Sequence, residues 1–159
     1  MFTLIFSGLA LIAVLIHLTL MKKPRTAGTV LEILLLYLFF FNMGFGGLLA
    51  FYGHTARAAE TALSIGWQPG SPFQFEVAVA NLAFGVLGIL CLWMRGNFWW
   101  AAAVGGGVFG LGAAYGHIRD MILAQNFAPN NAGLILWYGD IFLPLLLLLL
   151  LATYSRMKD

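Results

Sequence analysis

Two histidines and two carboxylates are the residues in this chain whose types and spacing can support chemistry. His54 is followed by Glu76, and His117 by Asp140, with nearly equal separations of about two dozen residues. Imidazole nitrogens and carboxylate oxygens together suit a divalent metal such as zinc, iron, manganese or copper. The same groups can hydrogen-bond a quinone-like or other amphipathic ligand, and paired histidines can ligate haem. A divalent metal is the first prediction for this set.

Further polar side chains are expected beside these four, because they lie close to them in the sequence. They are Tyr52, Tyr115, Tyr138, Arg57, Arg119, Asp120 and Asn81. A structural interpretation stands beside the metal or ligand one. Histidine at a helix end often satisfies backbone carbonyls and pairs with a carboxylate, and a relay of protons is a third interpretation.

The composition indicates which solvent surrounds the elements that position these residues. The 159-residue chain is 62% hydrophobic and only 9% charged, which is far from the balance of a soluble domain. The formal charge of +2 comes from short connecting segments, so nucleic acid is not an expected partner. Cys91 is the one cysteine, which excludes an intramolecular disulfide. The lipid bilayer is therefore the expected environment.

Five apolar stretches match the hydrocarbon thickness of a membrane, which a helix of about 20 residues crosses. They are Phe2 to Met21, Val30 to Tyr52, Phe73 to Met94, Phe98 to Ile118 and Leu134 to Tyr154. The prediction is an all-α, polytopic membrane helix bundle that forms one domain over residues 1–159. Between the second and third spans, Ala56, Ala59, Leu63 and Trp67 favour a short interfacial helix.

The distribution of Lys and Arg predicts the orientation. The first span has no basic residue before it, so we interpret it as a retained helix rather than a signal peptide. Six of the eight basic residues then share one side of the membrane, which the positive-inside rule makes cytoplasmic. They are Lys22, Lys23, Arg25, Arg95, Arg156 and Lys158. The N-terminus is predicted outside and the C-terminus inside.

A short internal repeat links the two histidines. Residues 47–54 and 110–117 share the pattern G-L-x-A-x-Y-G-H, and each copy is expected to end a helix that runs outward. Residues 30–94 and 98–154 are therefore predicted to be parallel repeat halves, with the first helix packed outside them. This arrangement places His54 and His117 together in the outer half of the bilayer, with Glu76 near Asp140.

Asp140 is the most costly of the four residues at its predicted depth. It lies roughly 9 Å inside the membrane boundary at 1.5 Å per residue, where an ionised group costs about 2.5–3.5 kcal/mol on insertion scales. It therefore needs a partner, and His117, Tyr138 or an arginine can serve. Pro144 should interrupt the helix next to it, because proline cannot donate to the carbonyl of Asp140.

Local patterns predict how the helices begin and pack. Ser71, Pro72 and Gln74 resemble a helix start in which Gln74 closes a capping box. Four-residue glycine spacings, Gly106 with Gly110 and Gly112 with Gly116, favour close packing and a central position for the span 98–118. Mid-membrane amides, Asn42 and Asn81, favour hydrogen bonds between helices. Glu32 is expected to be neutralised by Lys22, Lys23 or Arg95.

A family resemblance rests on the segment from Ile65-Gly66-Trp67 through Ser71-Pro72-Phe73-Gln74-Phe75-Glu76 to Ala80-Asn81-Leu82-Ala83-Phe84-Gly85. The chain resembles a family of small bacterial integral membrane proteins of unknown function, and the resemblance covers most of its length. In plan it is also loosely similar to the DoxX-like four-helix membrane proteins, some of which accompany quinone-linked redox systems. The resemblance implies the bacterial cytoplasmic membrane as location and no established activity.

Two functional hypotheses follow from the sequence. The first is a membrane protein that binds a metal or a small amphipathic ligand at His54, Glu76, His117 and Asp140. The second is an accessory or scaffold subunit of a larger membrane complex, or a homo-oligomer, whose polar cluster is purely structural. Nucleotide-binding loops, nucleophile elbows and protease motifs are not visible, so hydrolytic chemistry of the soluble type is not expected. The sequence leaves open whether the protein is an enzyme.

Overall fold

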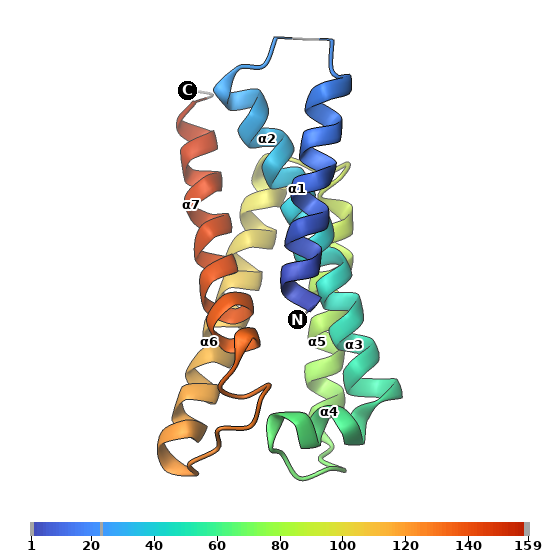
Figure 1. Ribbon diagram of the computed structural model, residues 1–159, viewed down its shortest axis with the longest axis vertical. Helices are drawn as coiled ribbons and strands as arrows, with labels where there is room; N and C mark the ends of the chain where they lie inside the picture. Colours follow the sequence, from blue (N-terminus) through green and yellow to red (C-terminus); the bar gives the residue numbers. More distant parts are fainter. Residues whose placement is uncertain (1, 23, 158–159) are drawn as a thin grey trace.

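The computed structural model describes residues 2–22 and 24–157, and all ordered elements in these ranges are helices (Figure 1). In chain order they are α1 (Phe2–Leu20), α2 (Ala27–Leu38), η1 (Phe39–Phe45), α3 (Gly46–Ala56), α4 (Ala58–Ile65), α5 (Phe73–Leu90), α6 (Asn97–Leu123), η2 (Ile135–Phe142) and α7 (Leu143–Arg156). The two elements labelled η are π-helical. The predicted all-α class is confirmed.

Five helical segments of the described chain are long and apolar enough to cross a membrane. They are α1, the continuous segment Ala27–Ala56, α5, α6 and the continuous segment Ile135–Arg156. Four of them match the predicted spans to within about a turn at each end. The exception is α6, which continues to Leu123 although the prediction ended at Ile118. A helix can project past the bilayer surface because its backbone hydrogen bonds are internal, so the polar residues there do not end it.

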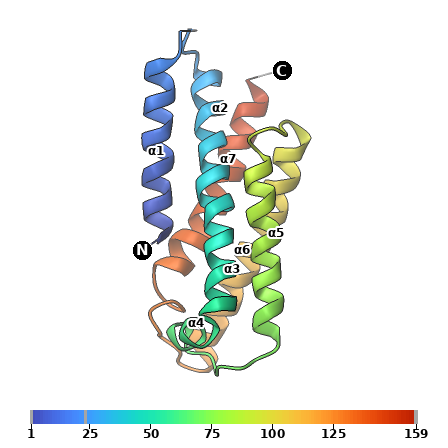
Figure 2. The ribbon, with the colours of Figure 1, turned by 90° about the vertical axis from the view of Figure 1, so that its right-hand side faces the viewer.

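The bundle has two distinct ends. The α1–α2 link, the α5–α6 link and the end of α7 lie toward one end, and α4 and the loop 124–134 lie at the other (Figures 1 and 2). We call the first the basic end, because Arg25, Arg95 and Arg156 belong to it. Here Arg95 donates to the Glu32 carboxylate at 2.7 Å, so Arg95 is the neutralising partner of Glu32. Lys23 and Lys158 lie outside the described residues.

The second end, which we call the α4 end, begins where α3 ends at Ala56. Helix α4 follows after Arg57, in the segment where a short helix was predicted, and it ends at Ile65 with Gly66 as its cap, whose φ of 83° is left-handed. Glycine adopts this conformation without the steric cost that a β-carbon imposes. The chain then turns back into the bundle as α5.

The apolar core lies in the half of the bundle nearer the basic end. Leu35, Phe39, Trp99 and Leu151 are each at most 2% exposed, and the rings of Phe39 and Trp99 lie 5.4 Å apart. The Trp99 indole donates to the carbonyl of Cys91 at 2.9 Å, so the polar atom of this buried ring is satisfied. The half nearer the α4 end contains more polar side chains and forms the candidate site.

Two long spans contain a π-helical segment: η1 lies near the middle of Ala27–Ala56, and η2 forms the beginning of Ile135–Arg156. In η2, the backbone N–H of Leu143 bonds to the carbonyl of Tyr138, five residues back. Pro144, which follows, has no N–H to continue the α-helical ladder to Asp140. The wider π turn changes the direction of the side chains on it, and such turns are frequent at functional sites. Asn42 lies in η1 and Asp140 in η2.

The closest helix approach lies between the segment Ala27–Ala56 and α5 rather than on the span 98–118. Gly47 of α3 packs against Gly85 of α5, and Gly44 of η1 packs against Gly88, with backbone atoms in direct contact. A β-carbon on Gly112 or Gly116 would meet nothing within 4 Å, so that pair does not mediate packing. Spacing identifies a small-residue face but not whether another helix covers it.

The span 98–118 is not the central one, which corrects that expectation. The segment Ala27–Ala56 has the largest buried share of the five spans and contacts α1, α5 and α7. Helix α1 lies at the edge of the bundle (Figure 2) and exposes most of its large apolar side chains. Gly110 of α6 packs closely on Pro144, since a β-carbon added to Gly110 would lie 3.1 Å from the Pro144 ring.

Candidate functional site

His117 of α6 and Asp140 of η2 face each other inside the bundle. His117 Nε2 lies 3.7 Å from Asp140 Oδ2, and the two side chains are only 12% and 20% exposed. This Oδ2 is buried and has no hydrogen-bond partner among the described residues. Of the partners predicted for Asp140, His117 is therefore the one the structure supplies.

Asn131 determines which nitrogen of His117 is protonated. Its side-chain NH₂ donates to two backbone carbonyls, those of His117 at 3.3 Å and Asn126 at 2.7 Å. The Asn131 oxygen, 2.7 Å from His117 Nδ1, must then be the acceptor. His117 therefore donates through Nδ1–H, and its neutral form has a lone pair on Nε2.

The His117–Asp140 pair needs a proton between its two facing atoms. Without one, the lone pair of Nε2 and the carboxylate Oδ2 would repel each other in a poorly solvated position. The stable states are imidazolium with carboxylate, or neutral imidazole with carboxylic acid, because a buried charge without a partner is costly. Both states are neutral overall. The pair thus contains one buried carboxylate oxygen without a hydrogen-bond partner in the described chain.

The backbone at Asp140 is also unusual. Its carbonyl oxygen lies 3.2 Å from the position that a β-carbon on Gly110 would take. Gly110 therefore allows α6 to approach η2 closely enough for His117, two turns further along α6, to reach the carboxylate. The predicted interruption at Pro144 coincides with the boundary between η2 and α7.

His54 lies in a different polar setting. Its Nδ1 is 3.4 Å from the amide nitrogen of Gln74, and its ring is 6.2 Å from the ring of Trp67. Gln74 is 5% exposed and donates to the carbonyl of Ala58 at 2.7 Å. The predicted capping box is therefore wrong: Pro72 occupies the cap without a side-chain bond, and Gln74 instead joins α5 to α4. Gln74 bonds to the carbonyl of Ala58 instead of the cap, because the tertiary fold places this acceptor beside its buried side chain.

The four predicted ligands do not form one cluster. Glu76 is exposed in the first turn of α5, and His54 lies against Gln74 and Trp67. In the part of the chain that the structure describes, there is no group of three or more His, Cys, Asp or Glu side chains placed to hold a metal ion. The pair that does meet is His117 with Asp140.

The predicted supporting residues are distributed over several surroundings. Tyr52 and Tyr115 are 53% and 71% exposed, and Arg119 is also exposed. The Arg57 guanidinium forms an ion pair with Glu60 at the surface, and the hydrogen bond that it donates to the Glu60 carboxylate raises the pKa of Arg57. Asp120 accepts a hydrogen bond from Asn126 at 2.6 Å. Asn81 donates to Val77 in its own helix, so its predicted interhelical bond is not found.

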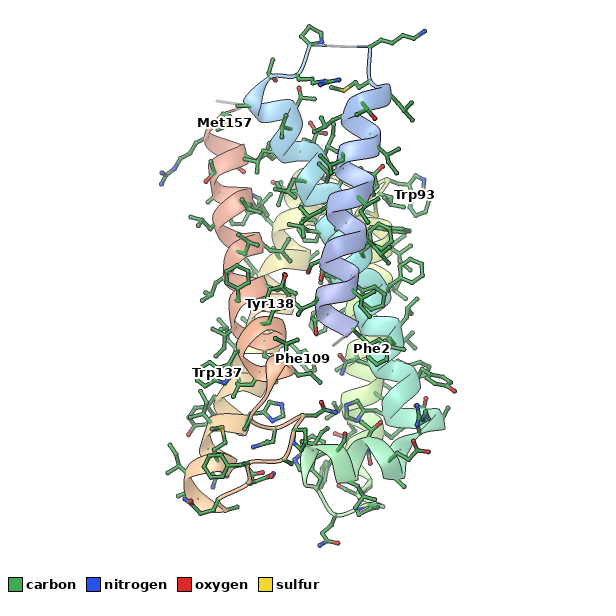
Figure 3. All side chains as sticks on the ribbon, viewed as in Figure 1. Phe2, Trp93, Phe109, Trp137, Tyr138 and Met157 are labelled. Atoms are coloured by element: carbon green, nitrogen blue, oxygen red, sulfur yellow. The ribbon has the colours of Figure 1, made fainter. Side chains whose placement is uncertain are left out.

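A second polar cluster joins α1 to both π-helical segments. Ser7 donates to Asn42 Oδ1 at 2.8 Å and accepts from the Tyr138 hydroxyl at 2.7 Å. Figure 3 shows Tyr138 between η2 and α1, with Trp137 on the other side of η2. The predicted interhelical bond of Asn42 is confirmed, although its amide nitrogen has no partner among the described residues. The Tyr138 hydroxyl therefore donates its hydrogen bond to α1 and not to Asp140.

Sequence reasoning missed three asparagines in the loop 124–134. Asn131 orients His117, Asn126 donates to the carbonyl of Ile65 at 2.8 Å, and Asn130 donates to Ser64 at 2.9 Å. The last two bonds join this loop to the end of α4. The clustering of three amides within a short polar segment was the available signal, because a loop that must satisfy its own backbone often uses such side chains.

Comparison with known proteins identifies the family. No curated protein matches the chain, and no solved structure matches it. A family model described as a family of unknown function (DUF6790) matches residues 1–159. The matched region includes every helix described above and the His117–Asp140 pair. The chain therefore belongs to the DUF6790 family.

Proposed function

We propose that this protein binds a small amphipathic ligand with a hydrogen-bonding oxygen, such as a quinone-like molecule, at the His117–Asp140 pair. The observation that supports this is the buried Asp140 Oδ2, which has no hydrogen-bond partner and lies 3.7 Å from His117 Nε2. Buried polar atoms are nearly always hydrogen-bonded, so an unpaired one marks a position where a further polar group is accommodated.

The chemistry of the pair suits a neutral ligand. Because the pair is neutral with one proton, a ligand carbonyl can accept that proton in a hydrogen bond without bringing a charge into the bilayer. Polar contacts in binding sites are often long before the ligand arrives and shorten once it is bound. A distance of 3.7 Å fits this state. Asn131 keeps Nε2, rather than Nδ1, directed toward the ligand.

A divalent metal has less support than an organic ligand. Protein metal sites for zinc have at least three protein ligands, whereas His117 and Asp140 supply two, and His54 and Glu76 do not join them in the described chain. Haem has less support again, because His54 lies against Gln74 and Trp67, whereas His117 lies against Asn131 and Asp140.

The orientation and the repeat form part of this proposal. We place the α4 end outside the bacterial cytoplasmic membrane and the basic end inside, following the charge distribution. The halves 30–94 and 98–154 are proposed as repeat units because each histidine lies against a polar side chain of the next long span, Gln74 for His54 and Asp140 for His117. In this proposal the first half has lost the acid and keeps a structural role.

The test is to purify the protein in detergent and measure binding of a short-chain ubiquinone by titration calorimetry. His117→Ala and Asp140→Leu should each weaken binding by about tenfold or more, since a lost hydrogen bond to a buried polar group costs about 1–3 kcal/mol. Glu76→Gln is the matched control, because Glu76 is an exposed carboxylate in the same half of the bundle.

Elemental analysis of the same preparation decides between the candidate ligands. If the protein contains stoichiometric metal and both His117→Ala and Asp140→Leu lose it, the ligand of the pair is a metal rather than an organic molecule. Absence of metal and of any saturable quinone binding would reject both. The scaffold interpretation, with a structural pair and a partner membrane protein or second copy, would then remain.

A further inference from the structure

A hollow opens at the α4 end of the molecule. It has a volume of about 480 Å³, which is in the range of small-ligand pockets. Its lining comes from the α4–α5 link, the start of α5 and the end of α6, namely Gly66, Trp67, Gln68, Ser71, Phe73, Gln74, Val77 and Asp120. Neither His117 nor Asp140 belongs to this lining. The hollow therefore requires its own explanation.

The lining combines aromatic rings with one carboxylate. Trp67 and Phe73 contribute the rings, and Asp120 is the only formally charged member of the lining. Aromatic faces attract organic cations through the ring quadrupole, and a carboxylate adds direct charge attraction. The other polar members, such as Gln74 and Ser71, are neutral. This set of side chains matches an ammonium group that carries apolar substituents.

The carboxylate of Asp120 is held in place by a neighbouring residue. Asn126 donates to its Oδ2 at 2.6 Å, while the other oxygen, Oδ1, has no protein partner among the described residues. The same Asn126 amide nitrogen also donates to the carbonyl of Ile65, the last residue of α4. Asp120 is therefore oriented before a ligand binds, which reduces the entropy cost of binding.

Helix dipoles add to the attraction for a cation. Helix α4 ends at Ile65 and α6 at Leu123, both beside this hollow, and the C-terminal end of a helix carries partial negative charge. Helix α5 begins at Phe73 and presents its positive end, but Glu76 in its first turn offsets that charge. Two helix ends and the Asp120 carboxylate thus favour positive charge.

We infer that this hollow binds an organic ammonium group. The group can belong to the headgroup of a lipid or to a free amine in solution, because the hollow lies at the α4 end, which faces the outer leaflet in the orientation proposed above. The two sources share the same recognising chemistry.

The experiment is a calorimetric titration of the detergent-solubilised full chain with choline. Saturable binding is expected, and Asp120→Asn should weaken it by about tenfold or more, as loss of a charge contact to a partly desolvated cation would. This substitution keeps an oxygen that can accept from Asn126, so the loop stays in place. Trp67→Leu, which removes an aromatic ring but no charge, should also weaken binding.

Glu60→Gln is the matched control, since Glu60 is a carboxylate at the same end that pairs with Arg57 and does not line the hollow. Its affinity for choline should equal that of the unmodified protein. An absence of saturable choline binding would overturn the proposal. So would equal losses in Asp120→Asn and Glu60→Gln, because binding would then reflect general surface charge.

Nanodiscs of two compositions distinguish the two sources. If a lipid headgroup is the occupant, choline should bind in nanodiscs of phosphatidylglycerol but not in nanodiscs of phosphatidylcholine, whose headgroups already fill the hollow. If a free amine is the occupant, choline should bind equally in both. Failure of choline to bind in both compositions would reject the ammonium site, independently of the outcome for the His117–Asp140 pair.

Discussion

Gly47 of α3 and Gly85 of α5 meet backbone to backbone. A β-carbon added to Gly47 would lie 2.7 Å from the amide nitrogen of Gly85 and 2.6 Å from the carbonyl oxygen of Asn81. Both distances are far below van der Waals contact, and the atoms met are backbone atoms that cannot rotate away. The two helices can therefore pack at this distance only while both positions remain glycine.

Gly47→Ala should destabilise the bundle by about 1–3 kcal/mol, because the added methyl group forces α3 and α5 apart. Thermal unfolding in detergent, followed by circular dichroism, measures the change. Gly112→Ala is the control, since a β-carbon there meets nothing within 4 Å, and it should be neutral or stabilising by up to about 1 kcal/mol. Equal stability of the two variants would show that the glycine contact does not determine packing.

Ser7→Ala should weaken the attachment of α1 to the bundle. Ser7 bonds to Asn42 and accepts from Tyr138, and side-chain hydrogen bonds between membrane helices contribute about 0.6 kcal/mol on average and up to about 1.7. A double-mutant cycle with Tyr138→Phe, based on the free energy of unfolding in detergent, measures the coupling between the two side chains. We expect a coupling energy of this size, and strictly additive effects would contradict the contact.

Asn126→Ala should loosen the loop 124–134 from α4, because it removes the bonds to Ile65 and Asp120 together. Cleavage of this loop by a soluble protease should become about fivefold to 150-fold faster, which corresponds to a loss of about 1–3 kcal/mol. Gln125→Ala is the control, since Gln125 bonds only within the same exposed turn. A cleavage rate equal in both variants would exclude the anchoring role of Asn126.

Membrane orientation can be tested with single cysteines at Gln68, at the α4 end, and Met157, at the basic end. Both positions are exposed. The native thiol of Cys91 is fully buried, so the unmodified protein should not react and serves as the background. An impermeant maleimide added to intact cells should label Gln68→Cys only. Labelling of Met157→Cys alone would reverse the proposed orientation.

The positions of the five spans followed from local properties of the chain. Whether a stretch such as Phe2–Leu20 can cross a membrane depends on its length and apolarity, and both follow directly from the local sequence. The charge pair of Arg95 and Glu32 and the bond of Asn42 to another helix could also be anticipated. In each case a polar group at a known depth needed a partner, and few partners were available at that depth.

The pairing of the remaining polar groups was decided by the tertiary structure. The sequence marked His54, Glu76, His117 and Asp140 as a set, but the rotation of each helix about its axis determines which side chains face inward. That rotation follows from contacts such as those of Gly47 with Gly85 and Gly110 with Pro144. It left Glu76 exposed and brought His117 to Asp140.

The π-helical turns and the contacts of the loop asparagines lay beyond sequence reasoning for the same reason. A π turn at η2 forms where the packed helix gains more from redirecting Tyr138 and Asp140 than it loses in regular hydrogen bonding. Asn131 reaches His117 only because the loop folds back over α6. The sequence therefore determined the membrane class and the polar residues available, and non-local packing decided which of them meet, because side-chain contacts between helices depend on distances that no local pattern encodes.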